Sequence, residues 1–212
     1  MHLEVLGRER SKLFYELSFL SKAGCYLAGG TALALQLGHR TSVDFDFYIK
    51  KHFKKNTLSD LFQDNLTHWP LKILRDFDDT FEIQAGKDIH LSCFYYRYPL
   101  LEKCINIFGV KAASIADIAA MKLVAISQRG KRRDFVDMYY LIKDFVLKKI
   151  INWTSQKYPH FDIYSGLRGL LYFEDADNDA EVMRIKVFDK NIKWPFVKKY
   201  IKNEVQKFQF GK

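Results

Sequence analysis

The sequence is poor in the residues that mark several specialised classes of protein. Its 212 residues include 4 prolines and 11 glycines, which excludes a collagen-like or proline-rich chain. No stretch approaches the ~20 consecutive apolar residues that span a bilayer, and the charged N-terminus lacks the apolar segment of a secretory signal. We therefore expect a cytoplasmic, globular protein that makes no membrane contact.

Cysteine is also scarce, and its spacing argues against two kinds of site. Cys25, Cys93 and Cys104 are odd in number, have no CxxC spacing and lie in apolar runs. This pattern disfavours both a disulfide framework and a zinc-binding cluster. The three cysteines are expected to be reduced residues of the core.

The sequence does have enough apolar material for a core, together with an excess of positive charge. Hydrophobic residues make up 48% of the chain and charged residues 28%, which excludes intrinsic disorder and allows one domain or two small ones. The net charge of +9 should attract polyanions. Much of the excess lies at 50–55 and 129–133, and the first of these clusters is explained equally well as a solvated surface.

The hydrophobic pattern changes near residue 112. Apolar and alternating runs before that point predict a small mixed sheet with flanking helices, and the remainder has helical periodicity. We expect an α+β protein with a sheet domain at 1–111 and a helical region at 112–212. Helices are predicted over 8–22, 31–37, 57–67, 114–126, 132–147, 160–172 and 195–209, and strands over 25–28, 43–49, 71–77, 80–84 and 89–96.

A glycine pair separates the first predicted strand from the helix that follows it. Gly29 and Gly30 follow the strand directly, and helix-forming residues run from Thr31 to a stop at Gly38. A glycine turn at a helix N-terminus leaves backbone N–H groups available where the helix dipole favours negative charge. The pattern predicts a phosphate-binding turn.

Two aspartates share one side of the next predicted strand. Within 43–49, Asp44 and Asp46 alternate with Phe45 and Phe47, so both carboxylates lie on the same face. A carboxylate on so apolar a strand is costly unless it is solvated, paired or bound to metal. Beside a phosphate-binding turn, two such oxygen ligands are suited to holding Mg²⁺ against a triphosphate.

Two basic features of the second half also suggest ligand contacts. Lys122 lies on the apolar stripe of the helix predicted from an N-cap at Ser114, so its side chain must either reach the surface or meet a buried anion. The segment Gln128–Arg133 lies between two predicted helices. Its Arg129, Lys131, Arg132 and Arg133 could contact one phosphate-bearing ligand.

Together these motifs resemble the signature of the AbiEii/AbiGii toxin nucleotidyltransferases, a branch of the DNA polymerase β-like superfamily. The likeness begins at 26–47, which contains the glycine pair and the aspartates, and continues at 117–126 and 133–141. Residues 171–176 and 194–201 resemble the helical tail of that family. The resemblance thus spans most of the chain.

The resemblance implies a polymerase β-like nucleotidyltransferase core, with the helical half closing over its site. Such an enzyme moves a nucleoside monophosphate from an NTP to an acceptor, with Mg²⁺ or Mn²⁺ as cofactor and pyrophosphate as product. Arg40 is a further candidate for the nucleotide phosphates, with a surface role as an equal alternative. The implied nucleotide-binding residues are Gly29, Gly30, Thr31, Arg40 and Lys122; the metal ligands are Asp44 and Asp46; and Asp134 completes the catalytic set or orients Lys122.

One position departs from the family pattern. Polymerase β-like enzymes commonly carry a third carboxylate on a later strand, whereas the strand at 89–94 has Ser92 there and no acid. Asp88, His90 or Asp134 could act as the base instead. The same gap leaves room for a catalytically inactive copy.

Charge and resemblance together favour a nucleic-acid acceptor, the 3′ end of a tRNA. Arg129, Lys131, Arg132 and Arg133 would contact its phosphates. The likeness to type IV toxins implies a cognate antitoxin protein as a partner. Two other functions stay open: nucleotidyl transfer to a small-molecule or protein hydroxyl, and an inactive nucleotide- or RNA-binding module.

Overall fold

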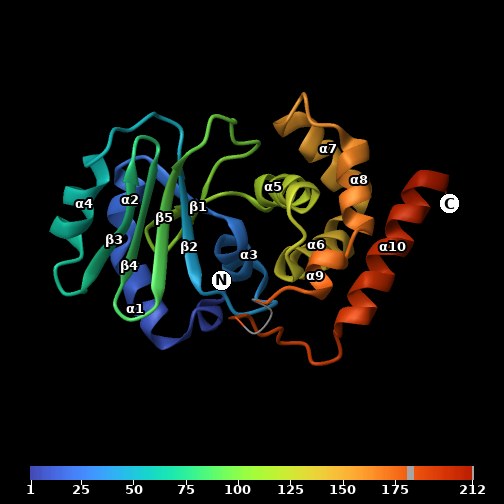
Figure 1. Cartoon of the computed structure of the whole chain (residues 1–212), viewed down its shortest axis with the longest axis horizontal. Coiled ribbons are helices and arrows are strands. Elements are labelled where there is room, and N and C mark those ends of the chain that lie inside the picture. Colours follow the sequence, from blue (N-terminus) through green and yellow to red (C-terminus); the bar gives the residue numbers. More distant parts are fainter. Residues whose placement is uncertain (181–183, 212) are drawn as a thin grey trace. The chain divides into compact units, whose positions relative to one another are not determined.

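The computed structural model describes residues 1–180 and 184–211, and the chain divides into two compact units. Residues 1–99 and 103–113 form the sheet unit, and residues 100–102 with those from 114 onward form the helical unit. In Figure 1 the sheet unit runs from blue to green and the helical unit from yellow to red. The predicted α+β class is confirmed.

The sheet unit is built on seven strands in the order β3-β4-β5-β2-β1-β7-β6. β2 runs parallel to β5 and β1 runs parallel to β7, while the other neighbours are antiparallel. The strands are β1 (Cys25–Ala28), β2 (Asp44–Ile49), β3 (Leu71–Phe77), β4 (Thr80–Ala85), β5 (Ile89–Tyr95), β6 (Ile105–Ile107) and β7 (Val110–Ala112). The helices of this unit are η1 (Leu3–Val5), α1 (Gly7–Glu16), α2 (Ser18–Lys22), α3 (Gly29–Leu37) and α4 (Thr57–Asn65).

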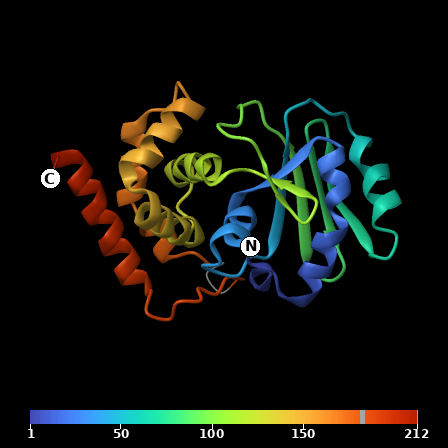
Figure 2. The same ribbon diagram turned by 180° about the vertical axis from the view of Figure 1, so that it is seen from behind.

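The two faces of the central strands differ in chemistry. Phe45 and Phe47 of β2 are fully buried, and Phe14 of α1 stacks on Phe45 with ring centroids 5.9 Å apart. Phe62 of α4 contacts Phe81 of β4 on the same side, at 5.2 Å. Figures 1 and 2 show α1 and α2 against this face, behind the strands in one view and in front of them in the other. The aspartates of β2 therefore lie on the opposite face from the helix-covered core.

The helical unit packs its elements around α5. α5 contacts α6, α7 and α8, and α10 packs on the same three helices. The predicted N-cap is confirmed, because the Ser114 side chain accepts a hydrogen bond from the Asp117 backbone. Glycine allows the close contact of α8 with α5, since a Cβ on Gly169 would lie 2.9 Å from the Cα of Ser127. The helices are α5 (Ile115–Gln128), α6 (Arg132–Phe145), α7 (Leu147–Lys157), α8 (Ile163–Leu171), α9 (Glu174–Asp177) and α10 (Trp194–Phe210).

Several elements differ from the sequence-based expectation. The helix predicted over 8–22 is interrupted at Leu17, and the predicted break at 175–179 begins within the short α9. The chain also contains α7, which was not expected, because the turn before it is made by Val146 at φ +57° rather than by a glycine or proline. β6 and β7 are three residues each, too short for an alternating pattern to be recognised.

No helix among the described residues combines the length and apolar character needed to cross a membrane. The longest, α10, has 17 residues and carries lysines along its length.

Candidate functional site

The glycine turn joins β1 directly to the first turn of α3. Gly29 has a φ of +70°, a conformation that glycine adopts without the steric cost of a side chain. Ala28 precedes the helix in extended conformation, and no side chain caps the helix start. The backbone N–H groups of the first turn are therefore not satisfied by a capping side chain, which is the arrangement expected of an anion-binding helix N-terminus.

Asp46 lies immediately beside this turn. The register pairs Ala28 of β1 with Asp46 of β2, and an added Cβ on Gly29 would lie 3.2 Å from the Asp46 Oδ2. Asp44 and Asp46 are both half-buried on the same face of β2. The structure thus brings together the predicted phosphate turn and the predicted metal ligands within the sheet unit.

Thr31 links the helix to the aspartate strand. Its Oγ1 contacts the Ser42 hydroxyl at 2.7 Å and donates to the backbone carbonyl of Asp44. The side chain is 2% exposed, so its hydroxyl serves to fix α3 against β2. A contact between Thr31 and a triphosphate would therefore use the backbone N–H, as at Gly30.

The residues present fit a magnesium ion shared with a nucleotide. No group of three or more His, Cys, Asp or Glu within the described part of the chain is arranged to hold a metal ion by itself. Mg²⁺ is commonly bound through one or two carboxylates, with substrate phosphates and water completing its shell. Asp44 and Asp46 supply that number of carboxylates beside the turn that would hold the phosphates.

The tight approach at Gly29 gives a testable expectation for Gly29→Ala. The new Cβ would press on the Asp46 carboxylate, and if Asp46 is a metal ligand as predicted, its displacement should lower kcat about 10-fold. Gly7→Ala is the matched control, because Gly7 also has a φ of +70° but has nothing within 4 Å of the added Cβ. Both variants should lose about 1–2 kcal/mol of stability from left-handed strain. Thermal melts and nucleotidyl-transfer rates of the two variants check this expectation, and equal rates would contradict it.

The helical unit holds a second cluster, formed by one lysine and two aspartates. The Lys122 Nζ lies 2.6 Å from Asp134 Oδ1 and 2.6 Å from Asp137 Oδ2. The three side chains are 8%, 2% and 0% exposed, in that order. Of the two alternatives for Lys122, the structure therefore shows the buried-anion one.

Asp137 is a member of this cluster that the sequence analysis did not assign. The signal was present, since Asp134 and Asp137 are three residues apart and so lie on one face of α6. The second carboxylate oxygen of Asp134 is buried without a hydrogen-bond partner among the described residues. Arg129 lies near it, with Nε 4.0 Å from Oδ2 and a side chain that is 60% exposed.

A further buried pair nearby has a structural explanation. Asp117 and Lys157 are both 0% exposed, with Nζ 2.6 Å from Oδ1. The Asp117 carboxylate also accepts hydrogen bonds from the Ser114 hydroxyl and from the backbone of Leu101 and Glu102. These contacts fix residues 100–102 to the start of α5.

Arg132 differs from the expectation of a phosphate-contacting side chain. Its guanidinium donates to the carbonyls of Ala176 and Asp177 and lies 5.0 Å over the ring of Trp194. Its backbone N–H donates to Asp179. Arg132 therefore joins α6 to α9 and α10, and its contribution to an acceptor site would be indirect.

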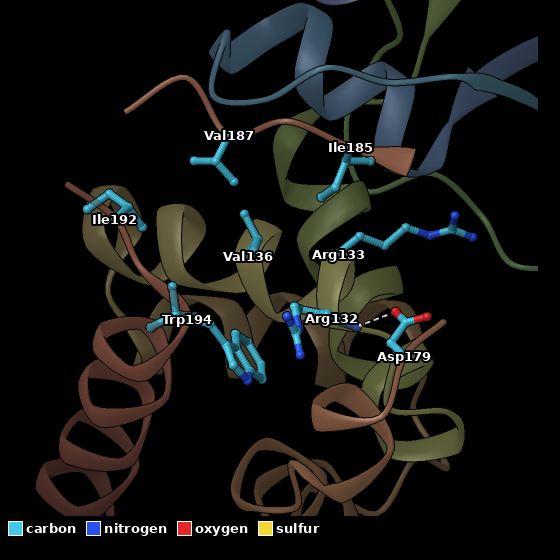
Figure 3. Close-up of a pocket in the computed structure, with 9 residues that line it drawn as sticks. Arg132, Arg133, Val136, Asp179, Ile185, Val187, Ile192 and Trp194 are labelled. Carbon is cyan, nitrogen blue, oxygen red and sulfur yellow. Dashed lines mark hydrogen bonds between the residues drawn. The ribbon is translucent and has the colours of Figure 1, made fainter. Parts of the chain in front are cut away.

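Arg132 and Trp194 line a cavity of about 130 Å³ within the helical unit. Figure 3 shows Val136, Ile185, Val187 and Ile192 around the same space, while the Arg133 side chain extends away from Trp194. Hydrogen bonds from Lys198 and Trp194 hold the pKa of the nearby Asp177 carboxyl below its ordinary value. The contacts of Arg132 and Asp177 thus hold together the start of α6, the short helix α9 and the start of α10.

We expect Arg132→Ala to destabilise the helical unit and Arg129→Ala to leave its stability unchanged. The first variant loses two hydrogen bonds and a cation–π contact, about 1–3 kcal/mol, or several degrees in Tm. The second removes an exposed side chain, with an effect within about 0.5 kcal/mol. Thermal denaturation distinguishes them, and equal melting temperatures would exclude the structural role of Arg132.

The remaining predicted residues have varied environments. Arg40 is 1% exposed and donates to the Thr41 carbonyl at 2.9 Å, so a nucleotide would reach its guanidinium only after local rearrangement. Lys131 precedes α6 as its N-cap residue.

All three cysteines are free, but only Cys25 and Cys93 are buried. A hydrogen bond with Cys25, together with burial, raises the pKa of the Cys93 thiol and keeps it protonated.

Comparison with known proteins identifies the family through one family model, and a relative with similar sequence spans most of the chain. The family model described as "Nucleotidyl transferase AbiEii toxin, Type IV TA system" matches residues 13–103 and 95–191. Protein aq_aa25 of Aquifex aeolicus (strain VF5) is 37% identical over 189 residues, which cover 86% of this chain and 87% of that protein.

Two solved structures share the fold across both units. JHP933 from Helicobacter pylori has a TM-score of 0.60 at 20% identity, covering 92% of this chain and 87% of its own. MenT4, a nucleotidyltransferase toxin from Mycobacterium tuberculosis H37Rv, has a TM-score of 0.61 at 15% identity, and the match covers 90% of this chain and 79% of the MenT4 chain. At these identities the likeness shows the fold alone.

Proposed function

Because the chain belongs to the family of AbiEii nucleotidyltransferase toxins of type IV toxin–antitoxin systems, we propose that it transfers an NMP from an NTP to the 3′ end of a tRNA. The observation that carries this proposal is the close approach of the Asp46 carboxylate to the Gly29 turn. Through that approach, ligands for a metal and donors for phosphates would meet where the central strand β1 ends beside β2.

The sheet unit would bind the nucleotide. Backbone N–H groups at Gly30 and Thr31 would donate to the triphosphate, and Asp44 and Asp46 would hold Mg²⁺ against it. The bound Mg²⁺ would supply charge neutralisation on the α-phosphate and the leaving pyrophosphate.

The helical unit would contribute a fixed ammonium group. The Lys122 Nζ lies 2.6 Å from one oxygen of each of two carboxylates, so its position is fixed although the side chain is buried. We assign Lys122 to the triphosphate, with Asp134 and Asp137 as the groups that orient it.

A nucleic-acid acceptor fits the charge of the protein. The net charge of +9 attracts polyanions, and the exposed Arg129 next to the Lys122 cluster is suited to an acceptor phosphate. Arg133 and Lys131 are the other candidates for this contact. A tRNA 3′ end combines an exposed hydroxyl with single-stranded bases, which proteins can recognise without opening a duplex.

Family membership also supports a protein partner. A type IV toxin is one member of a pair, so we propose a cognate antitoxin that limits this activity in the cell.

Incubation of the protein with Mg²⁺ and each labelled NTP in turn, with and without total tRNA, tests the proposed function. We expect label on RNA, dependent on Mg²⁺ and weakened by added salt because acceptor phosphates release counterions. Label on a protein or small molecule would instead reassign the acceptor, and bound NTP without any pyrophosphate release would indicate an inactive binding module.

A further inference from the structure

A third carboxylate lies in the same cross-strand row as Asp46. The register pairs Asp46 of β2 with Ser92 of β5, and Ser92 with Glu82 of β4. Paired residues point to the same face of a sheet, and the alternate residues Phe47, Cys93 and Phe81 are all buried on the other face. Glu82 therefore lies on the aspartate face.

The residue between the two carboxylates is small. Two strand spacings separate the Cα atoms of Asp46 and Glu82 by about 10 Å. Ser92 fills the intervening position with a hydroxymethyl group and is half-buried. A glutamate side chain is long enough to extend over this small residue toward Asp46, so the row has room for an acceptor hydroxyl only because Ser92, and no larger side chain, lies between the two carboxylates.

The chemistry of the row follows from its order across the sheet. Ala28 of β1, next to the phosphate turn, is on one side of Asp46, and Ser92 and Glu82 are on the other. In an in-line displacement at phosphorus the attacking oxygen enters opposite the leaving group. If the pyrophosphate leaves on the Gly29 side, the acceptor hydroxyl enters on the Glu82 side.

The environment of Glu82 is compatible with a role in proton transfer. Its side chain is 22% exposed, and its polar contact among the described residues is with the Arg75 Nη1, at 3.4 Å. Arg75 is itself 63% exposed, so this pair is weak and easily exchanged for a substrate contact.

The other candidate bases are held in ion pairs or lie outside the row that contains Asp46. The Asp88 carboxylate contacts Arg10 at 2.6 Å, and the Asp134 carboxylate contacts Lys122. His90 pairs with Asp44, so it lies one cross-strand row away from Asp46, the aspartate beside the Gly29 turn.

We propose that Glu82 is the general base for the acceptor hydroxyl, an inference that rests on the proposed function. The hydroxyl proton passes to the Glu82 carboxylate as the oxygen forms a bond to the α-phosphorus of the NTP. The bond from that phosphorus to the pyrophosphate oxygen breaks, and pyrophosphate leaves with the electron pair. Glu82 then returns the proton to solvent.

The test compares Glu82→Gln with Arg75→Gln, because both changes break the same ion pair and only the first removes the carboxylate. We expect Glu82→Gln to lower kcat about 10²-fold at saturating NTP, with Mg²⁺–NTP affinity and Tm unchanged. Arg75→Gln should keep the wild-type kcat. Ser92→Asp in the Glu82→Gln background should restore part of the rate, since it returns a carboxylate to the same row.

Three results would overturn the proposal: equal rates for the two single variants, a double variant no faster than Glu82→Gln, or a loss on His90→Gln that Glu82→Gln does not show. If Glu82→Gln does not fold, Glu82→Ala is measured by the same criteria. A wild-type protein that transfers no label to any acceptor refutes the proposed function itself, whereas an active wild type with an unaffected Glu82→Gln refutes only this inference.

Discussion

Asp46→Asn is expected to reduce nucleotidyl transfer by about 10³-fold or more while leaving the fold intact. The change would remove a negatively charged ligand of the proposed Mg²⁺ beside the Gly29 turn, and metal stabilisation of a transferred phosphate is worth several kcal/mol. The residue is half-buried on the face opposite the Phe45 and Phe47 core, so no core contact is lost. Transfer rates at several Mg²⁺ concentrations, with circular dichroism melts, provide the measurement.

Asp64→Asn provides the control for this variant. Asp64 is exposed on α4 and undergoes the same isosteric change away from the glycine turn, so its transfer rate should equal that of wild type. Undiminished activity in Asp46→Asn would remove the assignment of Asp44 and Asp46 as metal ligands, and with it the basis of the proposed function.

Lys122→Met should both destabilise the helical unit and abolish transfer. Removing the ammonium leaves Asp134 and Asp137 buried with no lysine between them, and breaking a buried ion pair from one side typically costs about 3–5 kcal/mol. We expect a large drop in Tm, or partial neutralisation of the two carboxylates. Loss of the charge that would meet the triphosphate should also eliminate measurable transfer.

Lys157→Met separates the two effects of that change. Lys157 is also buried and lies 2.6 Å from its aspartate, but Asp117 keeps hydrogen bonds from Ser114, Leu101 and Glu102. The Lys157→Met change should lower the Tm of the protein and leave nucleotidyl transfer measurable below that Tm. The transfer rates of Lys122→Met and Lys157→Met are compared at a temperature where both variants are folded. Equal rates would mean that Lys122 has only a structural role.

Local sequence patterns predicted much of the sheet unit. The alternation in 43–49 placed Asp44 and Asp46 on one face, and burial of Phe45 and Phe47 on the other confirms it. The stop at Gly38 and the N-cap at Ser114 were also confirmed, because both depend on a few neighbouring residues.

The same reasoning missed features whose signal was unusual or came from distant residues. The turn into α7 is made by Val146 at positive φ, a conformation rarely adopted by β-branched residues. The phosphate contact of Arg132 stays a prediction, but local sequence could not show that its guanidinium also joins α6 to α9 and α10, because these partners lie more than forty residues away in the sequence.

What the sequence determined by itself is therefore the chemistry available: a glycine turn, two carboxylates on one strand face, a lysine on an apolar helix and a family signature. Only the tertiary structure decided which groups meet. Strand register aligned Glu82 with Asp46 across Ser92, and helix packing buried Lys122 between Asp134 and Asp137. The physical reason is that periodicity arises from neighbouring residues, whereas register and packing depend on contacts between segments far apart in the chain.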